Sequence, residues 1–389
     1  MDTIATATIL AALVLLASMA SVELGVSVAI IEIALGVFAG NVLGITSTPW
    51  IDFLASFAGI LLTFLAGAEV DPQLLRARFR ESVLLGGLSF AVPFAAAGLF
   101  AYFVAGWDLR QSEIAGVALS TTSLAVVYAV LVETGLTRTE IGKLIMAATF
   151  VTDLGTATAL SVLFLQPSPF LIVFMAASVA VVAVMLALQP WFFRRYGDRV
   201  IEPEIKAAFL ALFVLMWTAD LAKSHAVLPA FLLGLAVARV FREHREEQKR
   251  FRVVAFSLLT PFFFLKGGLN VNVAALAGSL PLLAGFFVVK IGAKFAGVHP
   301  LALRWLRPHA TYTTLLMSTG LTFGTISSLY GLNAGIIDRT QFSLLITTVI
   351  LSAIVPTFLA QRFFSPPVHA LSSEEIEAVE DEEFEPGRA

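Results

Sequence analysis

Apolar runs of about 20 residues recur along almost the whole of this 389-residue chain, and they decide what it can fold into. In a bilayer, backbone polar groups must be satisfied within the protein, so runs of this length become membrane-spanning helices. Charged residues make up 14% of the chain, whereas a soluble domain carries about 25%. The sequence therefore predicts an all-α integral membrane protein.

Thirteen segments are long and apolar enough to span a membrane. We place them at 4–22, 25–45, 50–69, 82–105, 113–134, 140–165, 169–193, 203–221, 226–241, 253–269, 276–298, 309–330 and 341–363. Because the number is odd, the two termini are expected on opposite sides of the membrane. Residues 366–389 are acidic and poor in apolar side chains, which predicts a disordered tail.

Lys and Arg are distributed unevenly between the alternating loops of this arrangement. One set of loops, together with the tail, holds 19 of the 25 basic residues, and the other set holds 4. Cytoplasmic loops are enriched in Lys and Arg. The N-terminus is therefore expected outside and the C-terminus in the cytoplasm, with the chain in the cell inner (plasma) membrane.

The thirteen segments divide into two sets of six, joined by the segment 169–193. Matching segments are seven spans apart, so the two sets run through the membrane in opposite directions. Inverted repeats of this kind are typical of secondary transporters, whose binding sites lie between the repeats near the middle of the membrane. The sequence therefore predicts two inverted six-helix repeats.

Asp153 is the only carboxylate within the apolar part of the segment 140–165. Thr149, Thr152 and Thr156 lie at helical spacing from it and share its helix face. A carboxylate at that depth is costly to bury, and it usually belongs to an ion or proton pathway. Asp153 and Thr152 are the expected ligands of a monovalent cation, with Thr149 and Thr156 beside them.

The fifth segment of each six-helix set is interrupted by small and polar residues at comparable depth. The interruptions are Ser120, Thr121, Thr122 and Ser123 in the segment 113–134, and Ser318, Thr319, Gly320, Leu321 and Thr322 in the segment 309–330. Paired interruptions point to a transporter's binding site. The alternative is that these hydroxyls only bond back to the preceding turn of continuous helices.

Three lysines lie in the predicted spans between residues 253 and 298. Lys290 and Lys294 are four residues apart and share one face of the segment 276–298, with Lys294 nearer its cytoplasmic end. Each either lies deep in the protein or extends its ammonium to the membrane surface. Lys266, near the outer end of the segment 253–269, is expected to reach the surface.

The order of these motifs along the chain resembles that in the bacterial monovalent cation:proton antiporters of the second family. This family includes NapA-type sodium and Kef-type potassium transporters. The resemblance covers residues from about 25 to 365. It rests on Gly67-Ala68-Glu69, the run from Ala118 to Ser123, Thr152-Asp153, the run from Pro261 to Phe264 followed by Gly268, and Lys294.

The resemblance implies a transporter domain over residues 1–365 with the crossed broken helices of the NhaA/NapA fold. The implied core, about 82–165 and 276–363, moves against a dimerisation part, about 1–80 and 200–270, with 169–193 as a linker helix. The implied partner is a second copy of the chain, in a homodimer. Lys294 then either pairs with Asp153 or holds the carbonyls of a broken helix.

The implied function is alternating-access exchange of Na⁺ or K⁺ for H⁺. Electrogenic members carry two adjacent aspartates, whereas Thr152 replaces the first here, which predicts electroneutral 1:1 exchange with competition at Asp153. Family members often carry a charge in the second interruption, and this chain has none. The alternatives are a sodium-coupled symporter of an organic solute with related architecture, and a non-transporting regulatory relic.

The sequence offers little for other classes of function. It has no cysteine, and its five histidines lack metal-ligand spacing. We find no nucleophile–base pair and no phosphate-binding loop, so neither an enzyme nor a resident cofactor is expected. Nucleic-acid binding has no support.

Overall fold

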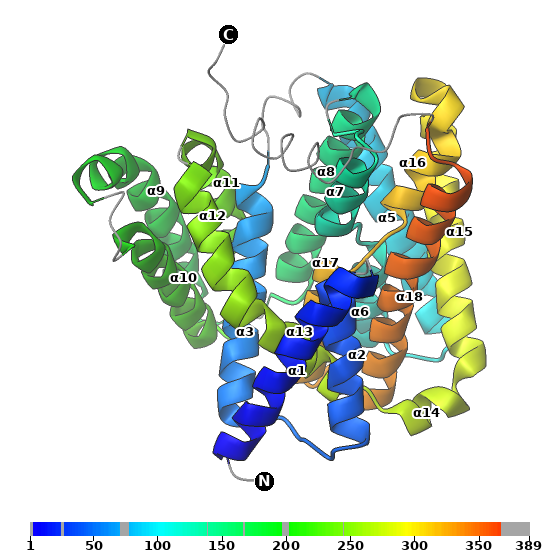
Figure 1. Cartoon of the computed structure of the whole chain (residues 1–389), viewed down its shortest axis with the longest axis horizontal. Helices are drawn as coiled ribbons and strands as arrows, with labels where there is room; N and C mark the ends of the chain where they lie inside the picture. Colours follow the sequence, from blue (N-terminus) through cyan, green and yellow to red (C-terminus); the bar gives the residue numbers. More distant parts are fainter. Residues whose placement is uncertain are drawn as a thin grey trace. The chain divides into compact units, whose positions relative to one another are not determined.

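The computed structural model describes residues 3–366, apart from 25–26, 71–77, 138, 166–167, 197–201 and 244. Every regular element in these residues is a helix (Figure 1). Nine helices or broken helices of the described ranges are long and apolar enough to cross a membrane, and two shorter apolar helices accompany them. The expectation of an all-α, multi-pass membrane protein is confirmed.

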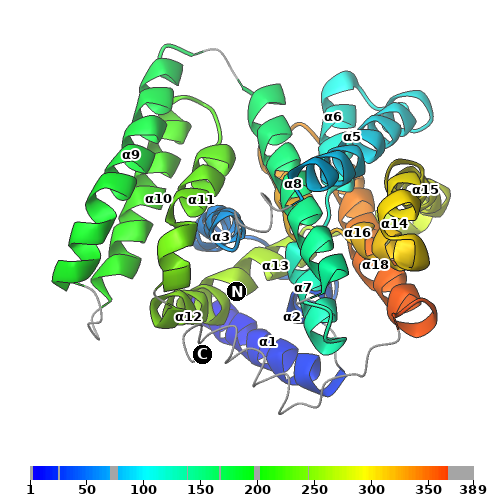
Figure 2. The ribbon, with the colours of Figure 1, turned by 90° about the horizontal axis from the view of Figure 1, so that it is seen from above.

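The chain forms two compact units, and the first comprises residues 1–70, 157–278 and 332–343. Its helices are α1 (Thr3–Leu24), α2 (Val28–Asn41), α3 (Pro49–Ala68), α9 (Leu171–Tyr196), α10 (Pro203–Leu221), α11 (Val227–Glu243), α12 (Arg245–Val254), α13 (Thr260–Leu269) and α14 (Val273–Gly278). A π-helical segment, Ala255–Leu259, joins α12 to α13, so the segment expected at 253–269 is not one regular α-helix. Helices α9 and α10 lie side by side (Figures 1 and 2).

Glycines set the closest helix contacts of this first unit. Gly67 of α3 lies against the backbone of Phe231 in α11, and Gly234 of α11 lies against the backbone of Phe64 in α3. Helices α2 and α13 cross in the same way, through Gly36 and Gly268. A Cβ atom at any of these glycines would overlap a carbonyl oxygen of the neighbouring helix. Small residues let helices in membranes approach closely, and here they fix two crossings.

The second unit comprises residues 71–156, 279–331 and 344–389. Its described helices are α5 (Phe79–Phe103), α6 (Leu109–Ser120), α7 (Leu124–Glu133), most of α8 (Glu140–Leu163), α15 (Leu280–Trp305), α16 (Ala310–Met317), α17 (Thr322–Asn333) and most of α18 (Arg339–Phe363). One apolar cluster joins α5, α7, α8, α15, α16 and α18, with Leu85, Ile145 and Leu316 among its fully buried members.

Helix α15 differs from its predicted position. It runs from Leu280 to Trp305 and continues through Pro300, whereas the sequence placed a helix at 276–298. The residues just before it form the separate short helix α14. Lys290 and Lys294 therefore lie near the middle of α15, and both are fully buried.

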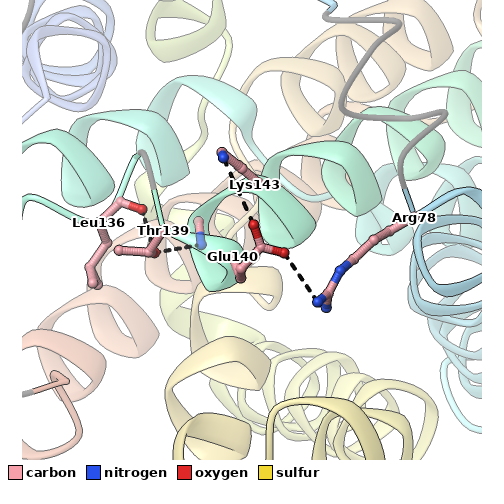
Figure 3. Close-up of polar contacts among 6 residues, drawn as sticks. Arg78, Leu136, Thr139, Glu140 and Lys143 are labelled. Carbon is pink, nitrogen blue, oxygen red and sulfur yellow. Dashed lines mark hydrogen bonds and ion pairs between the residues drawn. The ribbon is translucent and has the colours of Figure 1, made fainter.

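The start of α8 is fixed by a local cap and two ion pairs (Figure 3). The Thr139 hydroxyl donates to Leu136 O at 2.7 Å and accepts from the Gly142 N–H at 3.2 Å, so it acts as the N-cap. Glu140 pairs with Arg78 at 3.1 Å and with Lys143 at 3.8 Å. These charges are exposed and contribute little energy, but Glu140 is favourably placed at the positive end of the helix dipole.

Replacing Gly67 with alanine should destabilise the first unit. The added Cβ would overlap Phe231 O, and α3 and α11 would have to separate, at a cost of about 1–3 kcal/mol. The matched control is Gly292→Ala in α15, because a Cβ at Gly292 meets no atom within 4 Å. We expect the midpoint of thermal unfolding in detergent to fall for Gly67→Ala and to stay constant or rise for Gly292→Ala. Equal midpoints would refute the close crossing.

Candidate functional site

Two helices of the second unit are broken where the sequence placed polar interruptions. Helix α6 ends at Ser120 and α7 begins at Leu124, while α16 ends at Met317 and α17 begins at Thr322. The residues at both breaks, from Ser120 to Ser123 and from Ser318 to Leu321, are buried. The alternative that these segments are continuous helices is therefore wrong.

The two breaks are hydrogen-bonded to each other. The Ser123 N–H donates to Thr319 O at 2.9 Å, and the Thr122 hydroxyl donates to Met317 O at 2.9 Å. Met317 O lies at the end of α16, which has no further turn to satisfy it, and Thr319 O lies within the second break. The first break thus satisfies one carbonyl at the end of α16 and another within the second break.

The other hydroxyls at the breaks bond back to their own helices. Ser120 donates to Val117 O, Thr121 to Ala118 O, Ser318 to Thr314 O and Thr319 to Leu316 O, over 2.7 to 3.3 Å. Each such bond uses the hydroxyl hydrogen and leaves oxygen lone pairs available. Thr322 is the first residue of α17 and is only partly buried.

Lys294 holds the end of α6. Its ammonium donates to Ser120 O at 2.8 Å, to the Thr122 hydroxyl at 2.9 Å and to the Ser89 hydroxyl of α5 at 2.9 Å. The side chain is fully buried, and these three acceptors match the three donors of an ammonium. A cation at the C-terminal end of a helix also lies at the negative end of its dipole.

The threonines around Asp153 are buried with it on one face of α8. Thr152 donates to Ala148 O at 3.1 Å and to Gly86 O of α5 at 3.2 Å, and Thr156 donates to Thr152 O at 2.9 Å. The Thr149 hydroxyl is buried and has no hydrogen-bond partner among the described residues. Of the three threonines, Thr149 therefore has the hydroxyl that is most available to bind an ion.

Among the side chains of this unit that the structure describes, one carboxylate and two amines are buried. Asp153 is 2% exposed, whereas Lys290 and Lys294 are fully buried. Asp153 and Lys290 both lie within electrostatic range of Lys294, one attracting its ammonium and the other repelling it. The charged groups that the sequence singled out are thus gathered around the two breaks.

Lys266 is buried, and its reach to the membrane surface stays a prediction. It belongs to the first unit, where its ammonium pairs with Asp52 at 2.8 Å and donates to Asn333 Oδ1 at 3.3 Å. Its side chain is 4% exposed. Because a carboxylate neutralises it locally, Lys266 is a structural residue of that unit.

The structure also shows polar partners that sequence reasoning missed. Ser89 accepts from Lys294, and the Ser352 hydroxyl of α18 lies 3.5 Å from Gly320 O at the second break. Both are single serines in apolar helices, and no spacing or motif distinguishes them. The described residues contain no group of three or more His, Cys, Asp or Glu side chains that could hold a metal. The oxygens offered to a cation are hydroxyls, carbonyls and the carboxylate of Asp153, which suit a hard ion.

The fold and the site define a polytopic membrane protein built around two bonded helix breaks and a buried carboxylate. The family described as "Sodium/hydrogen exchanger, transmembrane" matches residues 8–364. The chain therefore belongs to this family, and the resemblance noted from the sequence is confirmed.

Curated relatives carry matching names. "Probable Na(+)/H(+) antiporter 3" of Methanocaldococcus jannaschii is 24% identical over 351 residues, covering 87% of this chain and 89% of the relative. "Na(+)/H(+)-K(+) antiporter GerN" of Bacillus cereus is 24% identical over 362 residues, covering 88% and 92%. The solved structure of the sodium proton antiporter MjNhaP1 from M. jannaschii at pH 8 has a TM-score of 0.69 at 15% identity, covering 94% of this chain and 100% of the other. That similarity shows a shared fold.

Replacing Thr122 with valine should loosen the crossing of the breaks. Valine keeps the shape but removes the donor to Met317 O and one acceptor of Lys294, at a cost of about 1–3 kcal/mol. The matched control is Thr357→Val in α18, whose hydroxyl only bonds back to Ala353 O. Thermal unfolding should show a clearly lower midpoint for Thr122→Val than for Thr357→Val. An equal loss in both would mean that the bridge contributes nothing beyond an ordinary back-bond.

Proposed function

We propose that this protein exchanges a monovalent cation, Na⁺ or K⁺, for H⁺ across the membrane, with Asp153 as the group both ions share. The observation that carries the proposal is the buried carboxylate of Asp153, the one buried carboxylate among the described residues of the unit that also contains the two bonded breaks. Family membership and the names of the relatives support the same reaction. Both Na⁺ and K⁺ are candidate substrates, because the name of one relative includes both ions.

Asp153 can pass through the exchange cycle in two neutral forms. With a proton it is a neutral acid, and with a monovalent cation it forms a neutral ion pair. The bare carboxylate is costly to bury, so it rarely crosses. Thr149, whose hydroxyl has no hydrogen-bond partner among the described residues, is the first candidate for a neutral ligand of the cation. The hydroxyls of Thr152 and Thr156 already donate their hydrogens, so they can offer a cation only their oxygen lone pairs.

Electroneutral 1:1 exchange follows from the groups around Asp153. Thr152 stands where a second aspartate would carry another charge, and its hydroxyl is bonded to the backbone of α5. Lys294 has three acceptors that stabilise its ammonium, so we expect its charge to stay constant through the cycle. One carboxylate then couples one proton to one cation.

The proposed architecture has thirteen spans in two inverted six-helix repeats. A constant offset supports it: α5 and α15, α7 and α17, and α8 and α18 each begin about 200 residues apart. The glycine crossings follow the same offset, because it relates Gly67 to Gly268 and Gly36 to Gly234. The α3–α11 crossing and the α13–α2 crossing would then be equivalent under the repeat.

Alternating access would move one part of the chain against the other. We propose a core formed by residues 82–165 and 276–363 and a dimerisation part formed by 1–80 and 200–270, with 169–193 as a linker helix. The division into two compact units supports most of these bounds, although residues 157–165 and 332–343 of the proposed core and the linker helix belong to the first unit. We further propose a homodimer in the plasma membrane, with the N-terminus outside and the C-terminus in the cytoplasm. The proposed orientation rests on the uneven distribution of Lys and Arg between the alternating loops.

Replacing Asp153 with asparagine should abolish exchange, because an amide can neither release a proton nor neutralise a cation. Purified protein is placed in liposomes with a pH-sensitive dye inside, and Na⁺, K⁺, Li⁺ or choline is added with the membrane potential clamped and unclamped. The wild type should give a cation-selective pH change that does not depend on the potential. Asp153→Asn should give none.

The matched control is Asp108→Asn. Asp108 is exposed and caps α6 through the Gln111 N–H, and asparagine caps helices equally well. This variant should exchange at the wild-type rate. A dye response retained in Asp153→Asn would remove Asp153 from the mechanism, and no response to any cation in the wild type would remove the exchange itself.

A further inference from the structure

Lys290 is a buried amine whose role the exchange at Asp153 leaves unexplained. It is fully buried in α15, one helical turn before Lys294. Its Nζ has no hydrogen-bond partner among the residues that the structure describes. An ammonium without acceptors is expensive to keep in a membrane protein, so such a residue usually has a function.

The tip of Lys290 lies directly over the second break. The point where a Cβ atom on Gly320 would sit is 2.5 Å from Lys290 Nζ, 2.7 Å from Thr121 Oγ1 and 3.2 Å from Thr121 O. Gly320 is therefore the residue that leaves room for the amine. All three atoms lie around one point, so the amine and the oxygens of Thr121 share the space beside Gly320.

The two lysines of α15 are thus used differently. Lys294 has three acceptors and is fixed to the end of α6. Lys290 has none at hydrogen-bond distance, yet it lies beside an oxygen whose hydrogen is already donated to Ala118 O. The Thr121 oxygens can accept either from an ammonium or from a metal cation, because both need the same lone pairs.

The second break has no charge of its own. Residues 318–321 are Ser, Thr, Gly and Leu, and the Lys290 amine lies beside Gly320. Lys290 and Lys294 lie one helical turn apart on α15, and both are fully buried, so two amines share this part of the unit. A positive charge held there lowers the affinity of the site for any further cation.

We infer that Lys290 is a tethered competitor of the transported cation: its ammonium occupies the space over Gly320 and competes for the oxygens of Thr121. In this role Lys290 sets the cation affinity and keeps the second break from accepting a cation of its own. The inference rests on the proposed exchange at Asp153. It makes Lys290 a residue that sets the affinity for the cation and itself carries neither ion.

Replacing Lys290 with methionine tests the inference, because methionine keeps the unbranched chain and removes the charge. In the liposome assay we expect the KM for Na⁺ and for K⁺ to fall about tenfold, the effect of removing one nearby charge from a poorly solvated site. The maximal rate should stay constant or fall, because a tightly bound cation leaves more slowly. A purely structural role would lower the amount of active protein without changing KM.

Two further variants complete the experiment. Lys143→Met removes an exposed lysine of α8 and should leave KM unchanged. Lys290→Gln, a second neutral replacement, should lower KM as Lys290→Met does. For either Lys290 variant, the rise of the unfolding midpoint with increasing Na⁺ or K⁺ gives the cation affinity even if transport is slow.

The outcomes separate the inference from the proposed function. Exchange with an unchanged KM, together with unchanged cation stabilisation, in both neutral variants would overturn the role of Lys290 and leave the exchange intact. Equal changes in Lys143→Met would also overturn it, because any lysine would then have the effect. Absence of exchange in the wild type would instead overturn the proposed function.

Discussion

The hydrogen bonds at the two helix breaks are the constraint on which the rest of the second unit depends. A broken helix in a membrane exposes carbonyls that neither water nor lipid can satisfy. Here the Lys294 ammonium satisfies Ser120 O at the end of α6, while Thr122 and Ser123 satisfy carbonyls at the end of α16 and within the second break. Without these bonds the breaks would be too costly, and the site would not exist.

The two units solve the packing problem by different chemistry. In the first, glycines bring α3 against α11 and α2 against α13 with no side chain between them. In the second, hydroxyls, amines and backbone carbonyls meet at the breaks, around an apolar cluster. Glycine contacts suit a unit that keeps one arrangement. Polar contacts can be exchanged for contacts with an ion, which is what a transport site requires.

Much of this organisation could be predicted from the sequence, because membranes leave few choices. The apolar runs, the interruptions at 120–123 and 318–322, and the burial of Asp153 all follow from the absence of water in the bilayer core. The sequence left open whether Lys290 and Lys294 are buried. The family could also be recognised from the sequence, because the resemblance rests on motifs in a fixed order along the chain.

The partners of each polar group could not be predicted. Ser89 accepts from Lys294 only because α5 and α15 pack at one particular rotation, and the pairing of Lys266 with Asp52 depends on contacts far apart in the chain. The length of α15 was also misjudged, because helix contacts in the folded unit carry it through Pro300. Spacing along one helix shows which residues share a face, but it does not show which residues of other helices contact that face.

Competition between one proton and one cation at Asp153 is the central claim, and the most direct test is to count protons released when a cation binds. Purified wild-type protein in weakly buffered detergent solution is titrated with Na⁺ or K⁺ over a range of pH, and the released protons are measured against the bound cation. The account predicts that the ratio rises towards one as the pH is lowered and never exceeds it, with cation affinity falling about tenfold for each unit of pH in that range. Binding without proton release, or a ratio near two, would contradict it.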